Sequence, residues 1–317
     1  MSNSRKVTIA IIILLAIGIL SIAGMAIYKK ISDGNKETTS TTTNATMSQV
    51  IDETEATAPV GLFYDDKTYS INRNVTTFLF LGVDKQDTPA TSVDTAVTNN
   101  GVVKYAFLFI FNGNDQTIDV VKVPFDTITP VGIYDADRNL VDTQEMALGN
   151  QYAFAESNAR GCFLMRNSIQ GIMGNHKIDY CCAISLEGLL SVVDSLDGVD
   201  VTLRNDWTDI NPAYETDSTV HITADEAQEF LNLQDNTNTD NRFNRSDWFM
   251  LSLFHSMMSR GSSDIDGLME AAGDDFENDV SEEVVTSLRD YTLDETTVIP
   301  ADGDMQDLLV RLFYVEV

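Results

Sequence analysis

The chain has 317 residues, of which 43% are hydrophobic, and this is enough for one membrane segment and a folded domain of roughly 200 to 250 residues. Its 20 Lys and Arg residues are outnumbered by 49 Asp and Glu residues, which gives a formal net charge of −29. So negative a surface repels phosphodiester backbones and argues against a broad nucleic-acid-binding face. The three cysteines, Cys162, Cys181 and Cys182, are too few for a disulfide framework.

The N-terminal region contains an uncharged apolar run at residues 7–28. At about 1.5 Å per residue, a helix of this length crosses a hydrocarbon layer of about 30 Å. A cleaved signal peptide is the alternative, but the run exceeds the roughly 7 to 15 apolar residues of such signals, and Lys29 follows it directly. We therefore expect a short tail at 1–6 and an uncleaved, single-pass transmembrane helix at 7–28. Basic residues flank both ends, so charge alone leaves the orientation open.

The segment after the apolar run is polar and rich in Thr, Ser and Asn, and it predicts a solvated stalk at residues 29–68. A folded domain is expected at 69–317. Within it, we expect a motif-bearing core at about 70–260 and a helical C-terminal part at 261–317.

Apolar periodicity divides this domain into alternating strands and helices. Runs of β-branched and aromatic residues predict strands at 75–83, 105–111, 117–124, 178–184 and 199–203. Helical spacing of apolar residues predicts helices at 143–155, 160–173, 185–196, 224–233 and 247–258, with another beginning at residue 281. Near-continuous apolar strands are typical of a sheet covered on both faces. The expected fold class is therefore α/β, an α-β-α sandwich with a central mixed sheet, preceded by one transmembrane helix.

Several well-known chemistries have little support in the sequence. No HExxH pair and no GxSxG elbow is present, which argues against a zinc protease or a serine hydrolase. Residues 135–139 resemble the start of a calcium loop, but Leu140 and Met146 occupy the positions that need Gly and Glu, so a solvated acidic turn is favoured. The vicinal pair Cys181-Cys182 lies in an apolar strand, where cysteine usually acts as a small hydrophobe, and a redox role is the minor alternative.

Five segments in a fixed order carry a more specific signal. They are FLFLGVD at 78–84, VKVPFDT at 121–127, IDY at 178–180, SLDGVDV at 195–201 and RFNR at 242–245. Together, behind an apolar run and a polar stalk, they resemble the LytR-CpsA-Psr family over about residues 70–260. The resemblance implies a membrane-anchored protein that faces outward from Gram-positive-type cells. It also implies binding of a polyprenyl-pyrophosphate-linked glycan, transfer of the glycan phosphate to peptidoglycan, and use of a divalent metal, for which Mg²⁺ is expected.

The resemblance also implies roles for particular residues. Asp84 would serve catalysis and the metal, with Asp94 as a second metal ligand, and Arg242 and Arg245 would contact the pyrophosphate. The residues that would bind substrate or line a slot for its lipid are Lys85, Phe125, Met250, Leu253, Phe254 and Met257. The alternatives are a strand-ending turn residue for Asp84, surface salt bridges for the arginines, and ordinary core for the apolar residues.

The chain departs from the family pattern at five positions. Phe125, Asn232 and Gln234 stand where the family has arginines, Tyr105 stands where it has a second metal-side aspartate, and Ser246 replaces a glutamine. If each charge-assisted contact contributes about 1.5 to 3 kcal/mol, three missing arginines would remove roughly 4 to 9 kcal/mol. We therefore expect phosphotransferase activity to be reduced or lost. The alternatives are a non-catalytic lipid- or partner-binding scaffold at the cell surface and an acidic surface protein that attracts cations.

Overall fold

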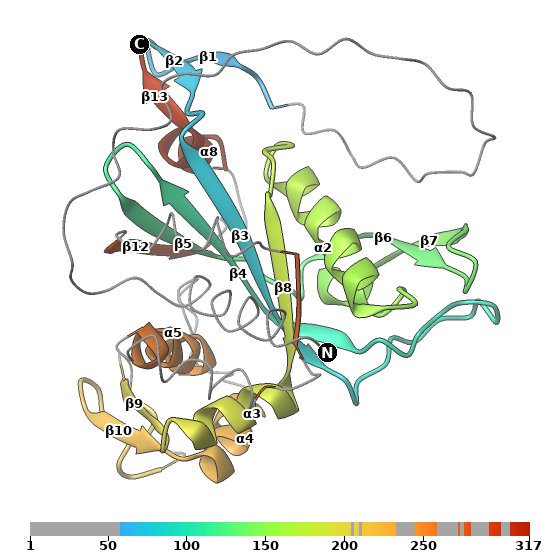
Figure 1. Cartoon of the computed structure of the whole chain (residues 1–317), viewed down its shortest axis with the longest axis vertical. Coiled ribbons are helices and arrows are strands. Elements are labelled where there is room, and N and C mark those ends of the chain that lie inside the picture. Colours follow the sequence, from blue (N-terminus) through green and yellow to red (C-terminus); the bar gives the residue numbers. More distant parts are fainter. Residues whose placement is uncertain are drawn as a thin grey trace, which may run out of the picture.

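The computed structural model describes residues 58–203, 206–208, 211–232, 245–258, 272, 276–279, 292–298 and 305–317. They form a mixed α/β fold around a six-stranded sheet with the order β11-β8-β3-β4-β5-β12 (Figure 1). The strands are β3 (Val75–Asp84), β4 (Val102–Asn112), β5 (Thr117–Lys122), β8 (Tyr180–Ser185), β11 (Phe276–Asn278) and β12 (Thr292–Val298). β8 pairs in parallel with β3 and β12 with β5, whereas β4 and β11 are antiparallel to their neighbours. The sheet is therefore mixed, as predicted.

The two faces of this sheet carry different side chains, because successive residues of a strand point to opposite faces. β4 contains the run from Phe107 to Phe111, whose phenylalanines belong to one core cluster while Leu108 and Ile110 belong to the other. The aromatic face is covered by α3 (Leu186–Ser195), α4 (Ala224–Asn232) and α5 (Arg245–Met258). The opposite, aliphatic face is covered by α2 (Asn158–Ile172) and α8 (Met305–Phe313). Figure 1 shows α5 and α2 on opposite sides of the sheet.

Local signals in the sequence explain where several elements begin and end. Thr223 precedes α4, and its backbone N–H donates to the Glu226 carboxylate at 3.0 Å, as a capping box requires. After α3, Gly198 has a φ of +93°, a backbone conformation that is strained for any residue with a Cβ atom. The chain then enters β9 (Val199–Thr202). β9 pairs with β10 (Thr219–Ile222). The helix expected from residue 281 and the transmembrane helix expected at 7–28 lie outside the described residues.

The prediction of a helix at 143–155 is wrong. This segment contributes to β7 (Leu140–Ala147), which pairs with β6 (Ile128–Tyr134), and then forms the 3₁₀ helix η1 (Leu148–Tyr152). The connecting turn decides the pairing, because the Asp135 carboxylate accepts the backbone N–H groups of Asp137 and Asn139, both at 2.9 Å. The acidic turn expected at 135–139 is thereby confirmed.

Both ends of the described domain also differ from expectation. β1 (Gly61–Tyr64) and the start of β2 (Lys67–Ile71) fall in the range assigned to the stalk, and both join a small sheet with β13 (Tyr314–Glu316). The C-terminal part is not wholly helical either, since it supplies β11 and β12 to the central sheet. Among the residues described, no helix is long and apolar enough to cross a membrane.

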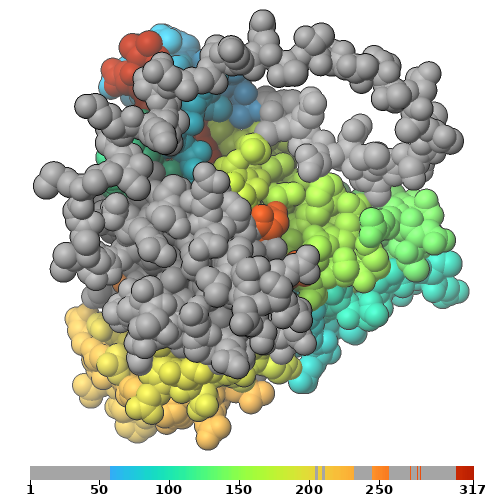
Figure 2. Space-filling view, viewed as in Figure 1, coloured from blue at the N-terminus to red at the C-terminus, as the bar shows by residue number. Residues whose placement is uncertain are grey.

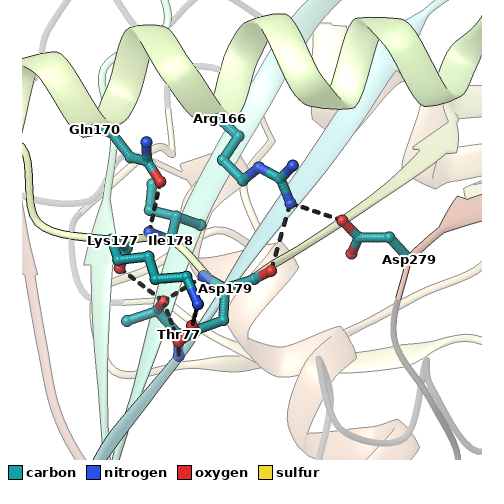
Figure 3. Close-up of polar contacts among 7 residues, drawn as sticks. All are labelled: Thr77, Arg166, Gln170, Lys177, Ile178, Asp179 and Asp279. Carbon is teal, nitrogen blue, oxygen red and sulfur yellow. Dashed lines mark hydrogen bonds and ion pairs between the residues drawn. The ribbon is translucent and has the colours of Figure 1, made fainter. Parts of the chain in front are cut away.

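A polar network fixes the amino-terminal ends of β3 and β8 against α2 (Figure 3). The Asp179 carboxylate accepts the Thr77 backbone N–H at 3.1 Å, and the Asp179 N–H donates to Thr77 Oγ1 at 2.8 Å. Lys177 Nζ lies 2.7 Å from the other Asp179 carboxylate oxygen. From α2, Arg166 donates to the Asp179 carbonyl at 3.4 Å and to the Asp279 carboxylate at 2.8 Å. These contacts lock the parallel register of the two strands at this edge.

His176 lies between α2 and β8 and packs against α8. Its ring stacks on Phe313 with the centroids 4.4 Å apart, and Nδ1 lies 2.7 Å from the Met173 carbonyl oxygen. Burial lowers the pKa of His176 below its ordinary value, which favours the neutral ring in the folded protein.

The free energy of unfolding should therefore fall as the pH drops below about 6.5, because the unfolded chain takes up a proton that the folded His176 resists. His176→Asn keeps an amide that can donate to the Met173 carbonyl but cannot titrate. Urea unfolding across pH 5 to 7 should show a flatter acid limb for this variant than for the wild type.

His221 provides a control of opposite sign. It is exposed, and its hydrogen bond with Asp200, at 2.8 Å, raises the pKa of His221. The protonated His221 stabilises the fold below about pH 6.5, and this contribution is lost as the pH rises through the raised pKa of the folded protein. His221→Asn should therefore steepen the acid limb. If the stability of the wild type and of His176→Asn changed in the same way with pH, His176 would not be the cause of the loss at low pH.

Candidate functional site

The carboxyl-terminal ends of β3, β5 and β8 meet at one edge of the central sheet, because β3 and β5 are both antiparallel to β4 and β8 is parallel to β3. Ligands of open α/β sheets bind outside this kind of edge. β3 ends at Asp84, which pairs with Val102 at the start of β4, and β5 ends at Lys122. We call this the carboxyl edge.

Asp84 is partly exposed at the carboxyl edge and is held by its own loop. Its Oδ1 accepts the backbone N–H groups of Gln86 at 2.9 Å and Asp87 at 3.3 Å. Both hydrogen bonds use Oδ1, so Oδ2 can still face a cation. Gly101 has a φ of +85°, and a Cβ there would lie 2.6 Å from the Asp84 carbonyl oxygen, so only glycine allows β4 to begin so close to Asp84. Asp84 is both a turn residue and an available carboxylate.

Lys85 and Phe125 lie on the aliphatic side of this edge. Lys85 Nζ donates to Asn158 Oδ1 at 2.5 Å, at the start of α2, and lies 5.9 Å from the centre of the Tyr152 ring. Phe125 is partly buried against the aliphatic-face cluster. Phe125 therefore packs on the face opposite α5, which carries the rest of the expected lipid slot, and Lys85 contacts the start of α2.

The apolar residues of α5 pack on the aromatic face instead. Met250, Leu253 and Phe254 are buried there, and the Phe254 ring makes edge-to-face contacts with Phe80 at 5.1 Å and Phe107 at 5.7 Å between centroids. The structure thus does not join them with Phe125 in one slot, and in this arrangement they are core residues.

Arg245, at the start of α5, is buried with 1% of its surface exposed, so it is not a surface salt-bridge residue. Its guanidinium carbon lies 5.0 Å from the centre of the Phe230 ring and 5.8 Å from that of Trp207, within the range of cation–π attraction. The positions that lie outside the described residues are Arg242 and Gln234, together with the side chains of Asn232 and Met257.

The residues expected to hold a metal fit it only in part. Asp94 is exposed, and its neighbours Val93 and Ala96 pack on the small cluster of the β6–β7 hairpin, so the hairpin fixes the loop that carries it. Within the described ranges, no group of three or more His, Cys, Asp or Glu side chains could hold a metal ion. Mg²⁺ often binds one or two carboxylates and takes its remaining ligands from water and substrate phosphates. Asp84 suits this mode, and Asp94 as its second carboxylate stays a prediction.

An ion pair that the sequence reasoning missed connects β5 to α5. Lys122 Nζ lies 2.5 Å from Asp247 Oδ2, and the two side chains are 16% and 4% exposed. Strand alternation could have revealed it, because Val121 and Val123 belong to the aliphatic-face cluster and Lys122 must then point to the aromatic face, toward α5.

Tyr105 lies on the same face, two residues before the partner of Lys122 in β4. Its hydroxyl donates to the Leu231 carbonyl oxygen at 2.9 Å and also hydrogen bonds with Ser246. Burial raises the pKa of Tyr105, so the phenol stays neutral and cannot replace a metal-binding aspartate.

The cysteines give no support to a redox site. Cys181 packs on the aliphatic face and Cys182 on the aromatic face, and both are free thiols. Burial raises the pKa of each thiol, which suppresses the reactive thiolate.

A mixed α/β sandwich with a charged carboxyl edge is a fold class that many activities share, and comparison with known proteins narrows it. The chain belongs to the LytR_cpsA_psr family, whose family profile matches residues 24–310. No curated protein matches the sequence.

Solved structures of similar fold come from several bacteria. Lin1025 from Listeria innocua has a TM-score of 0.52 and 16% identity, over 75% of this chain and 97% of that one. The protein gbs0355 from Streptococcus agalactiae has a TM-score of 0.55 and 14% identity, over 75% and 86%. TagV from B. subtilis has a TM-score of 0.52 and 14% identity, over 75% and 97%. At these identities the likeness shows the fold.

The two ion pairs of the carboxyl edge should differ in their contribution to stability. Asp247→Ala leaves the ammonium of Lys122 inside the structure without this carboxylate, and should lower the free energy of unfolding by about 3 to 5 kcal/mol. Asp87→Ala removes the partner of Lys104, whose pair is 32% and 42% exposed, and should cost about 0 to 1 kcal/mol. Urea unfolding measures both, and equal small losses would show that the Lys122–Asp247 pair is not effectively buried.

Proposed function

We propose that the chain is a single-pass, membrane-anchored protein of the cell envelope whose domain lies outside the membrane and binds a polyprenyl-pyrophosphate-linked glycan. Peptidoglycan is the proposed acceptor if transfer occurs. Family membership supports this proposal, as does the apolar run at 7–28 followed by a polar segment. The observation that carries it is the carboxyl edge, where β3 and β5, which run in the same direction on either side of β4, end at Asp84 and Lys122.

The proposed ligand has two chemically different parts, a charged headgroup and an apolar tail, which need different partners. A pyrophosphate requires positive charge, and Asp84 would hold Mg²⁺ together with phosphate oxygens. The metal, when bound, would neutralise part of the phosphate charge. The lipid would lie between α5 and the aromatic face. Because Phe254 fills that space, α5 must shift when lipid enters.

Transfer of the glycan is proposed to be reduced or absent. Of the departures from the family pattern, Phe125 packs into the aliphatic-face cluster and Tyr105 uses its hydroxyl to bind the Leu231 carbonyl. Neither can stabilise the charge that develops on a phosphoryl group during transfer. Binding would then persist while the chemical step is slow.

A second candidate is a non-catalytic scaffold that binds a partner protein. The β6–β7 hairpin favours it, because Ile128, Leu140 and Val141 are 65%, 57% and 39% exposed there. In the space-filling view this hairpin, in green, projects at one side of the molecule (Figure 2). Exposed apolar side chains grouped on a projecting element are typical of protein contacts.

The full chain in detergent should bind about one polyprenyl-pyrophosphate glycan, and Mg²⁺ should strengthen that binding, since Asp84 would hold the ion and the ion would supply positive charge for the phosphates. Asp84→Asn should abolish the gain from Mg²⁺ and leave the metal-free affinity within about threefold. Asp94→Asn tests the second expected ligand: the same loss of the Mg²⁺ gain would assign Asp94 to the metal, and wild-type behaviour would leave Asp84 to hold it without Asp94. Calorimetric titration with and without Mg²⁺ measures both effects.

Each outcome decides between the candidates. Absence of any glycan binding would overturn the proposed function and favour the partner-binding scaffold. Rapid Mg²⁺-dependent transfer to peptidoglycan by the wild type would contradict the proposal of reduced activity.

A further inference from the structure

The Lys122–Asp247 pair is nearly buried, whereas ion pairs of Lys and Asp usually lie at the surface. A buried ion pair is a poor source of stability, because desolvation of both charges offsets most of their attraction. An apolar pair of similar volume would bind β5 to α5 at least as well. The position of the pair at the carboxyl edge therefore suggests a task other than stabilisation.

The surroundings of the pair favour an anion. A lysine ammonium has three N–H donors, and the contact with Asp247 occupies one of them. Lys122 is 16% exposed, whereas Asp247 is 4% exposed, so solutes reach the cation more easily than its counter-ion. Arg245 adds a second positive charge close enough to act on the Tyr105 phenol. Asp247 and Asp84 act on the same phenol with negative charge, so an anion is favoured by the more exposed ammonium of Lys122 rather than by a local excess of cations.

We propose that Lys122 is a phosphate-binding residue and that Asp247 is its resting counter-ion, which the incoming phosphate displaces. This inference rests on the proposed function and assigns the headgroup contact to Lys122, which is flanked by valines in the sequence. Lys122 would supply positive charge at an edge where Phe125 and Tyr105 supply none.

The displacement has a mechanical consequence. The pair joins the last residue of β5 to the first turn of α5, and Phe254 of α5 packs on Phe80 and Phe107 beneath it. Release of Asp247 removes this ionic contact between α5 and the sheet. Binding of the headgroup would then weaken the attachment of α5 to the sheet, between which the lipid is proposed to enter.

Inorganic pyrophosphate isolates the headgroup contact from the lipid. The full chain in detergent at low salt should bind it without Mg²⁺, and calorimetry should show at least a tenfold loss of affinity for Lys122→Met. Asp247→Asn should raise the affinity severalfold, because the competing negative charge is gone while the amide can still accept a hydrogen bond from Lys122. A purely structural role for the pair predicts no such increase.

Two further variants serve as controls. Lys104→Met removes another paired lysine at the same edge and should change the affinity less than twofold. Lys122→Met combined with Asp247→Leu replaces the pair by apolar side chains, so it should stay folded but not bind. Unchanged affinity in Lys122→Met, weaker binding in Asp247→Asn, or no binding by the wild type would overturn the inference. The proposed function is judged separately by the lipid-linked glycan, so either can fail alone.

Discussion

The alternation of aromatic and aliphatic residues in β3 and β4 is the constraint on which the rest of the structure depends. Phe78 and Phe80 in β3, like the phenylalanines of β4, face α3, α4 and α5, while Leu79 and Leu81 face α2 and α8. A slip of one residue in either strand would exchange the two faces and leave both helical layers with the wrong partners. Ring contacts of Phe254 with three phenylalanines of the sheet, at 5.1, 5.7 and 5.3 Å between centroids, show how closely α5 depends on this parity.

The same parity decides which charges reach the candidate site. Lys122 continues the alternation of β5 and so points toward α5, where it meets Asp247. The same alternation continues past the end of β5 and places Phe125, like Val121 and Val123, on the aliphatic side. The carboxyl edge is consequently divided into one part over α5, with Lys122 and Tyr105, and another part beside α2, with Lys85. The proposed headgroup contact belongs to the first part.

Much of this arrangement could be predicted from the sequence, and the exceptions have physical causes. The central strands and α2, α3 and α5 bury strongly apolar faces, so their patterns are clear. β11 and β12 lie at the outer edges of the sheet, where a strand needs fewer apolar residues, and so the sequence of the C-terminal part does not predict these strands. Asp84 was recognisable because it ends a strand. The burial of Arg245 could not be predicted, because the rings that cover it, Trp207 and Phe230, come from other segments of the sequence.

The most direct test of this account asks which face of the sheet receives the lipid. A polyprenyl pyrophosphate with a photoreactive group in its first isoprene unit can be cross-linked to the full chain, and the labelled peptides can be mapped by mass spectrometry. The account predicts labels in β4 and α5, on the aromatic face below Lys122. Labels confined to α2 or α8, which cover the aliphatic face, would contradict it.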